Sequence, residues 1–348
     1  MKIKLGDRLV GDDEPALIVA EISCNHLQKK DYALKLIGEA KGAGADAAKF
    51  QTYTPDTMTI KCDNEHFRIK GTIWEGRTLY DLYEEACTPW EWFPELRDKC
   101  REEGIMFLST PFDESAVDLL EGLDVPTYKI ASFEINHIPL LKHVAKKGRP
   151  VILSTGVAEL SDIELALKTV RDEGNNEIAL LKCTSSYPAP LGEMNLRTIL
   201  DMGERFGTVV GLSDHSMGII APVVAVALGA KIIEKHFILK RSDGGPDAKF
   251  SVEPNEFREM VRAVRDAEES LGKVDYELGD NAKKHLFARR SIFTVKDINR
   301  GELFTTENIR VIRPGNGMHP KYYADVIGKK ASMDVKRGTP LEKKHVDR

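Results

Sequence analysis

Two histidines lie at the ends of two consecutive β-type runs in this sequence. The run GLSDHS over residues 211–216 contains His215, and the run IIEKHF over residues 232–237 contains His236. If the two strands are neighbours in a sheet, both imidazoles meet at one edge of it. Two neutral imidazoles are ready ligands for a divalent metal and leave positions open for substrate and water, as catalysis requires. The alternative is that each histidine caps its own strand and is satisfied locally.

Charged residues also occur within or next to several β-type runs. Side chains alternate across a strand, so Lys49 and Gln51 share one face of KFQTY, and Glu234 shares a face with His236. A lysine or glutamate inside a β-barrel is costly unless it is partnered. The residues that need such an explanation are Glu21, Lys49, Lys129, Glu134 and Glu234. They either form internal ion pairs that only close the barrel, or belong to a site for phosphate and carboxylate groups.

Hydroxyl side chains gather at the ends of the same runs. They are Ser109, Thr110, Ser132, Ser154, Thr155, Ser185 and Ser213. Each alone is weak evidence, because Ser and Thr also cap the helix that follows a strand; together they favour an anion site. Lys129 and Ser132 have opposite parity in YKIAS, so both face the site only if the strand ends or bends near Ala131.

Eight strand and helix units in series position these residues. The β-rich runs cover residues 17–23, 47–53, 105–111, 127–132, 150–156, 178–185, 208–215 and 231–237, with helical periodicity between many of them. This order predicts a (β/α)8 TIM barrel with its active site at the carboxyl ends of the strands. A doubly wound open sheet is the rival fold, but no GxGxxG follows the first strand.

Two further segments depart from the simple barrel pattern. The stretch from Pro55 to Pro89 is too long for a tight connection, and its WEGRTLYDLYEEAC portion predicts a helix on a functional loop. The second segment is the end of the chain, where a polar, weakly periodic stretch is followed by short β-type runs. Residues 1–270 are therefore predicted as the barrel domain, 271–288 as a linker, and 289–348 as a small β-rich domain.

The composition excludes several classes of protein. The chain has 348 residues and a formal net charge of -5, which gives no general electrostatic footprint for nucleic acid. The longest apolar stretch, residues 219–230, is too short to span a membrane. Five cysteines without a CxxC pair, and an amino terminus without an apolar run, predict a reduced, cytoplasmic protein.

Motifs along nearly the whole chain resemble the sialic acid synthase family. They include AEIS, KFQTYTPDTMTI, STPF, YKIASFE, KCTSSYP, GLSDHS, IEKHF and GGPDAKFS, followed by a tail from ARRS to IRPGNGMHP. The resemblance implies a TIM barrel with a C-terminal antifreeze-like SAF domain. It also implies a domain-swapped homodimer in which each SAF domain closes the partner's active site.

The resemblance also assigns roles by position. It implies that His215 and His236 hold a divalent cation, usually Mn²⁺, with Mg²⁺ or Co²⁺ as alternatives. The positions that match the phosphoenolpyruvate site are Lys49, Thr110, Lys129, Ser132, Ser154 and Ser213, and Phe112 of STPF joins the substrate-binding set. The amino-sugar positions are Glu21, Gln51, Tyr187 and Asp247, with Arg313 from the swapped domain. One departure is Ser185, which stands where N-acetylneuraminate synthases have Asn.

The implied reaction condenses phosphoenolpyruvate with an open-chain amino sugar. Within the family, TPDTMTI, the insert, SDHSMG and the GMHPKYY tail most resemble the branch that uses 2,4-diacetamido-2,4,6-trideoxy-L-altrose. We expect Glu21, Glu134 or Glu234 to manage the protons. The alternatives are N-acetylmannosamine or a legionaminate precursor as the acceptor, or, in another class, a non-catalytic sugar- or ice-binding protein.

Overall fold

The computed structural model describes residues 1–347, so Arg348, the last residue of the predicted small domain, lies outside the described residues. The chain divides into two compact units, one over residues 1–272 and one that begins at Lys273. No helix among residues 1–347 combines the length and apolar character needed to cross a membrane.

Eight parallel strands form the sheet of the first unit, in the order β5-β4-β3-β10-β9-β8-β7-β6. They are β3 (Leu17–Glu21), β4 (Ala47–Thr52), β5 (Met106–Pro111), β6 (Tyr128–Ile130), β7 (Val151–Ser154), β8 (Ile178–Cys183), β9 (Val209–Asp214) and β10 (Ile232–His236). The two outer strands, β5 and β6, also lie next to each other, so the sheet curls into a nearly closed barrel. The predicted (β/α)8 barrel is confirmed.

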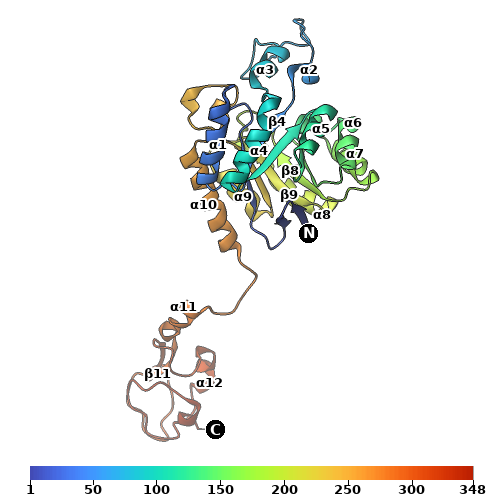
Figure 1. The fold of residues 1–348 in the computed structure, drawn as a ribbon. Coiled ribbons are helices and arrows are strands. Elements are labelled where there is room, and N and C mark those ends of the chain that lie inside the picture. Colours follow the sequence, from blue (N-terminus) through green and yellow to red (C-terminus); the bar gives the residue numbers. More distant parts are fainter. Residues whose placement is uncertain (348) are drawn as a thin grey trace. The chain divides into compact units, whose positions relative to one another are not determined.

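Eight helices follow the eight strands and surround the sheet (Figure 1). They are α1 (Lys30–Gly42), α4 (Phe93–Glu103), α5 (Glu114–Gly122), α6 (Ile138–Lys146), α7 (Leu160–Asp172), α8 (Thr198–Phe206), α9 (Ile220–Ala227) and α10 (Pro254–Leu271). Their apolar residues recur at intervals of three or four residues. Helix α1, for example, buries Ala33, Leu36, Ile37 and Ala40. Such a stripe packs onto the outer face of the sheet and leaves the polar side in water.

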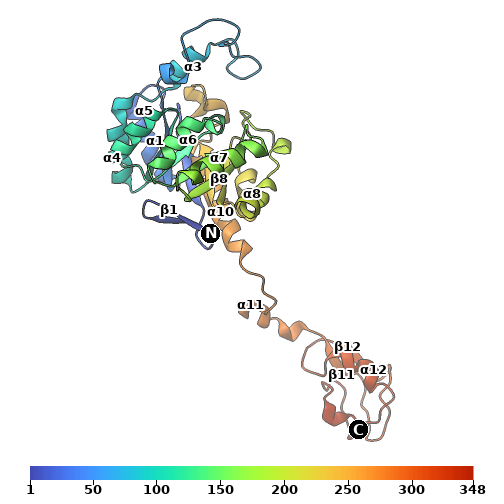
Figure 2. The ribbon, with the colours of Figure 1, turned by 90° about the vertical axis from the view of Figure 1, so that its right-hand side faces the viewer.

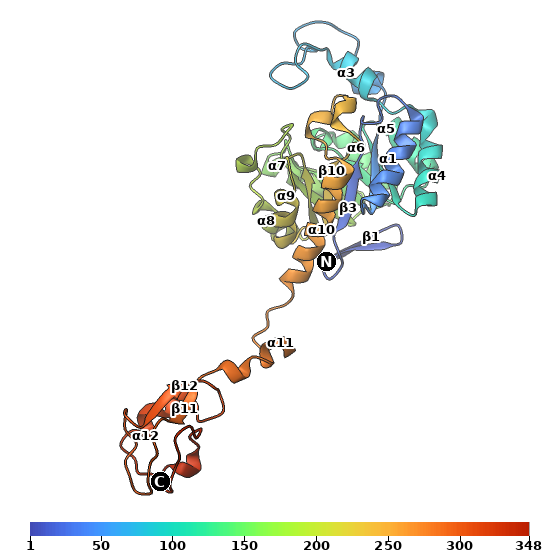
Figure 3. The ribbon, with the colours of Figure 1, turned by 90° about the vertical axis from the view of Figure 1, so that its left-hand side faces the viewer.

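The interior of the barrel changes from apolar to charged along the strands. Leu17 and Val19 of β3 belong to an inner apolar cluster, whereas Glu21 on the same face lies at the carboxyl end of the strand. A hairpin of β1 (Lys2–Leu5) and β2 (Arg8–Gly11), not anticipated from the sequence, adds apolar side chains to this cluster. Figures 2 and 3 show the hairpin at one end of the barrel and α3 (Leu79–Ala86) at the other.

The insert between β4 and α4 contains α2 (Pro55–Met58) and α3. The second unit holds a two-stranded antiparallel sheet of β11 (Ser291–Thr294) and β12 (Ile309–Ile312), with the short helices α11 (Asp280–Lys283) and α12 (Tyr323–Val326). Its own small core includes Ile292, Phe304 and Leu341. A β-rich C-terminal unit is therefore present, as predicted.

A buried ion pair joins the two strands that carry the histidines. Lys235 Nζ of β10 lies 2.5 Å from Asp214 Oδ2 of β9 and donates a hydrogen bond of 2.7 Å to the carbonyl of Ser216. Both charged side chains are fully buried. They alternate with the inward-facing side chains of the same strands, so the pair fixes the ends of β9 and β10 from outside the barrel.

We predict that Lys235→Met lowers the free energy of unfolding by about 3–5 kcal/mol, because it leaves Asp214 buried without its cation. The matched control is Lys168→Met, which removes an exposed i,i+4 pair with Asp172 and should cost only about 0.3–0.5 kcal/mol. Urea denaturation followed by circular dichroism measures both values. Equal small losses would show that the buried pair does not hold these strand ends.

Candidate active site at the barrel mouth

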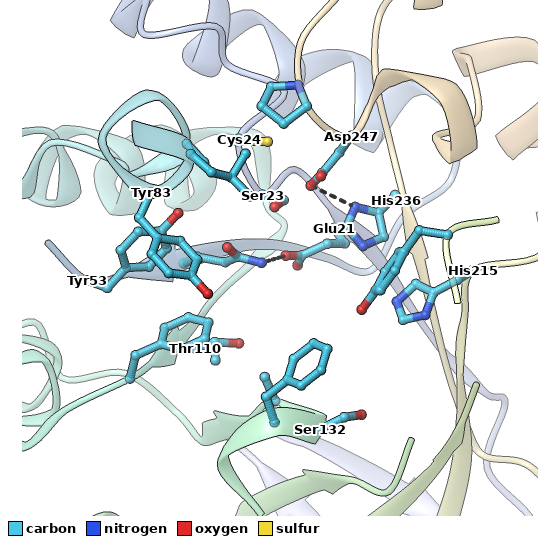
Figure 4. A pocket seen from close by; sticks show the side chains of 18 of the residues that line it. Glu21, Ser23, Cys24, Tyr53, Tyr83, Thr110, Ser132, His215, His236 and Asp247 are labelled. Carbon is cyan, nitrogen blue, oxygen red and sulfur yellow. Dashed lines mark hydrogen bonds and ion pairs between the residues drawn. The ribbon is translucent and has the colours of Figure 1, made fainter. Parts of the chain in front are cut away.

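A cavity of about 360 Å³ opens at the carboxyl ends of the strands. All the residues predicted for the site line it except Ser185 and Arg313: Glu21, Lys49, Gln51, Thr110, Phe112, Lys129, Ser132, Glu134, Ser154, Tyr187, Ser213, His215, Glu234, His236 and Asp247. Figure 4 shows several of them converging from different strands. Because β6 ends at Ile130 and a 3₁₀ turn follows Ala131, Lys129 and Ser132 face the same cavity despite their opposite parity.

The two exceptions lie elsewhere. Ser185 follows β8, and its hydroxyl lies next to Gly156 and 3.8 Å from Cys183 Sγ, but it is not among the residues that line the cavity. Arg313 follows β12 in the second unit and is exposed there.

Two lysines and two glutamates form an ionic cluster at the floor of the cavity. Lys49 Nζ lies 2.6 Å from Glu21 Oε2 and 3.6 Å from Glu234 Oε1, and Lys129 Nζ lies 3.8 Å from Glu234 Oε1. All four side chains are at least nine-tenths buried. The charges therefore balance one another in a region where an unpaired charge would be very costly.

Neutral groups complete the hydrogen bonding of this cluster. Lys49 donates to Thr110 Oγ1 at 3.2 Å, and Lys129 donates to Ser154 Oγ at 2.7 Å. Ser213 Oγ donates to Glu234 Oε1 at 3.2 Å, and Gln51 donates to Glu21 Oε1 at 3.2 Å. The hydroxyl oxygens that accept from the lysines are therefore held beside the cations, where an anionic ligand would meet both.

The glutamates differ in their affinity for protons. Burial raises the pKa of Glu21 to about 7, although Lys49 opposes the shift, and burial likewise raises the pKa of Glu134 to about 7. For Glu234, burial alone would raise the pKa, but Lys129 and Lys49 together hold it below its ordinary value. Glu21 and Glu134 are thus poised to exchange protons near neutral pH, whereas Glu234 stays ionised.

The two lysines also differ in their affinity for protons. Burial acts to lower the pKa of Lys49, but Glu21 and Glu234 together raise it above the ordinary value, so Lys49 remains a firm cation. Burial lowers the pKa of Lys129, whose carboxylate partner is farther away.

The two histidine rings are neighbours at the rim of the cavity, with centroids 5.4 Å apart. His215 Nδ1 donates to the carbonyl of Thr184 at 3.0 Å, which leaves Nε2 as its ligand atom. His236 Nδ1 is buried without a hydrogen bond among the described residues and lies 3.5 Å from Asp247 Oδ2 (Figure 4). Burial lowers the pKa of His236, so this ring is neutral.

These features fit a divalent cation. A neutral, buried imidazole nitrogen without a hydrogen-bond partner and a second imidazole beside it provide suitable donors. Among residues 1–347 no cluster of three or more His, Cys, Asp or Glu side chains is arranged to hold a metal, so a cation would depend on the two imidazoles and on ligands from outside the chain.

Several lining residues were not identified from the sequence. Tyr53, Trp74, Tyr83 and Phe250 supply aromatic surface, and Ser23 and Cys24 lie near Asp247 (Figure 4). The length of the insert was the only sequence signal for Trp74 and Tyr83, because their contacts depend on how that loop folds back over the barrel.

Comparisons with known proteins agree with this geometry. Residues 36–276 match the NeuB family, and residues 289–347 match the SAF domain. The chain is 46% identical to the pseudaminic acid synthase of Campylobacter jejuni over 330 residues, covering 95% of this chain and 96% of that protein. It is 42% identical to the pseudaminic acid synthase of Helicobacter pylori, covering 96% and 99% of the two chains.

Solved structures also resemble this chain. The N-acetylneuraminic acid synthetase of Leptospira borgpetersenii, solved in complex with citrate, superposes with a TM-score of 0.74 at 33% identity. The match covers 82% of this chain and 95% of that one.

We predict that Glu134→Gln gains stability relative to the unmodified protein as the pH rises. The pKa of Glu134 is raised from 4.5 to about 7 on folding. The contribution of this side chain to the free energy of unfolding is therefore full below about pH 4.5, and it is lost as the pH rises through 7. Glutamine mimics the protonated acid at every pH. Urea denaturation at about pH 4.5 and pH 8 should therefore show a change of order 3 kcal/mol in the stability difference between the two proteins. A difference that is constant with pH would contradict the raised pKa.

Proposed function

Because this chain belongs to the NeuB family, we propose that it catalyses the reaction of a pseudaminic acid synthase. In this reaction phosphoenolpyruvate condenses with 2,4-diacetamido-2,4,6-trideoxy-L-altrose and water, giving a nine-carbon 2-keto acid and phosphate. The chain is thus a transferase that forms a carbon–carbon bond. The observation that carries the proposal is the buried lysine and hydroxyl cluster beside two adjacent histidines.

The donor occupies the floor of the cavity in this proposal. Lys49 and Lys129 offer positive charge, and Ser132 and Ser154 offer hydroxyl donors, whereas the hydroxyl of Ser213 donates to Glu234. Charge-assisted hydrogen bonds to phosphate and carboxylate are strong where water is excluded. The anionic donor replaces Glu21 as the partner of Lys49, whereas Glu234 stays within reach of both lysines.

The chain's carboxyl groups manage the protons. When the enol carbon of the donor attacks the aldehyde carbon, the aldehyde oxygen takes up a proton, and water later adds at the carbon that loses phosphate. Glu21 and Glu134, with pKa values of about 7, exchange protons readily near neutral pH. Glu234 stays ionised and keeps the two lysines and Ser213 in position.

A divalent cation held by His215 and His236, with Mn²⁺ the first to test, would supply a Lewis acid for the aldehyde oxygen. Asp247, whose Oδ2 lies 3.5 Å from His236 Nδ1, lies on the acceptor side of the cavity together with Tyr187.

A panel of acceptors tests the proposal. The purified protein is mixed with phosphoenolpyruvate, Mn²⁺ and one of three sugars: 2,4-diacetamido-2,4,6-trideoxy-L-altrose, N-acetylmannosamine or the legionaminate precursor. We expect phosphate release to be fastest with the first sugar. Release no faster than without acceptor for all three would refute the reaction, and fastest release with another sugar would refute the acceptor assignment.

Two lysine variants in the same assay identify the donor site. Lys129→Met should lower kcat/KM for phosphoenolpyruvate by about 10²–10³-fold, because it removes a charged group at the cavity floor. Lys182→Met, which changes a lysine of strand β8 that does not line the cavity, is the matched control and should keep near-normal activity.

We also propose that the protein is a homodimer in which the C-terminal unit of one subunit completes the site of the other. The residue that would cross is Arg313, which is exposed in its own unit. Residues 1–270 would form the catalytic domain, 271–288 the linker, and 289–348 the SAF domain that matches over residues 289–347.

We predict that an Arg313→Ala protein and a His215→Ala protein, each inactive alone, regain activity when their subunits are mixed. In a swapped heterodimer one of the two sites receives both natural residues, so random reassortment should restore about a quarter of the natural activity. Phosphate release after unfolding and refolding the two proteins together measures this value. If mixing restores nothing although heterodimers form, Arg313 does not act on the partner.

A further inference from the structure

The cavity has two chemically different halves. The strand ends supply the charged and hydroxyl groups, whereas the insert of residues 55–89 supplies mainly apolar surface. The insert residues that line the cavity are Met58, Ile69, Thr72, Trp74, Leu79, Leu82, Tyr83 and Ala86. Only Thr72, Trp74 and Tyr83 among them carry a polar side-chain atom. A ligand that reaches from the histidines to the insert therefore meets a wall with few hydrogen-bonding partners.

Hydrogen bonds hold the insert in its place over the barrel. Ile69 N donates to the carbonyl of Arg77 at 2.9 Å, and Leu79 N donates to the carbonyl of Phe67 at 2.8 Å, which makes a hairpin-like loop. Near its tip, Trp74 Nε1 donates to the carbonyl of Pro246 at 3.0 Å. The indole donor of this wall is therefore used within the protein, and the wall is formed before any ligand binds.

Aromatic contacts extend this wall on both sides. The Trp74 ring lies 5.5 Å from the Tyr187 ring, whose own centroid is 4.4 Å from that of His215. On the other side, Tyr53 and Tyr83 pack edge to face at 5.8 Å. Figure 4 shows these two tyrosines across the cavity from His215. Burial raises the pKa of both tyrosines, so the wall is uncharged at neutral pH.

We propose that the insert selects the acceptor by its apolar groups. The wall formed by Met58, Ile69, Leu79 and Leu82 accepts the methyl groups of a 6-deoxy, N-acetylated sugar and disfavours a hydroxymethyl group at the same position. This inference rests on the proposed function, since the histidines fix which end of the sugar reacts. An added hydroxyl without a partner lowers kcat/KM by about 10–100-fold, which is the range a hydrophobic pocket achieves.

A pair of matched sugars tests the inference. One is 2,4-diacetamido-2,4,6-trideoxy-L-altrose, and the other differs only by a hydroxyl at C6. The natural protein should prefer the 6-deoxy sugar by about 10–100-fold in kcat/KM. The double variant Ile69→Thr, Leu79→Asn should reduce this preference at least fivefold by offering polar partners in the wall. If the double variant does not fold, the single variant Ile69→Thr is used in its place, because it keeps the β-branch and makes the smaller change.

The matched control is Ile60→Thr. Ile60 belongs to the same insert but is 61% exposed and does not line the cavity, so its replacement should leave the preference unchanged. Equal kcat/KM for the two sugars in the natural protein, or an unchanged preference in the folded wall variants, overturns the inference. Absence of phosphate release with both sugars instead overturns the proposed function.

Discussion

The ionic cluster of Glu21, Lys49, Lys129 and Glu234 is the constraint on which the rest of the structure depends. Four charged side chains are buried inside a β-barrel, and each is tolerated only because the others and their hydroxyl neighbours are within reach. The cluster requires strands in fixed register, since a slip by one residue would turn every charge outward. It also leaves the lysines with partners that an anionic ligand can replace.

The apolar and the charged end of the barrel interior both consist of the side chains that point inward from the strands. At the amino ends of the strands the inward positions are apolar, and the N-terminal hairpin covers them. At the carboxyl ends the inward positions are charged or hydroxylated, and they open to the cavity. The outward positions hold a different ion pair, Lys235 with Asp214, which steadies the two histidine strands. One strand pattern thus separates the stabilising core from the reactive mouth.

Much of this arrangement could be predicted from the sequence because it depends on local periodicity. The eight strands, and the convergence of His215 and His236, follow from short runs that are consecutive in the chain. The roles of Trp74 and Phe250 could not be predicted, because their contacts arise where long loops fold back over the barrel. The hairpin at the amino terminus was missed for a similar reason, since four-residue strands carry little periodic signal.

Titration of the protein with phosphoenolpyruvate in a calorimeter, at about pH 8 and in two buffers with different ionisation enthalpies, tests the central claim most directly. If the donor takes over the lysines from the carboxylates, its negative charge raises the pKa of Glu21 further, and binding takes up protons from the buffer. The account predicts an apparent binding enthalpy that depends on the buffer in the sense of proton uptake. Binding without any buffer dependence, or no binding at all, would contradict it.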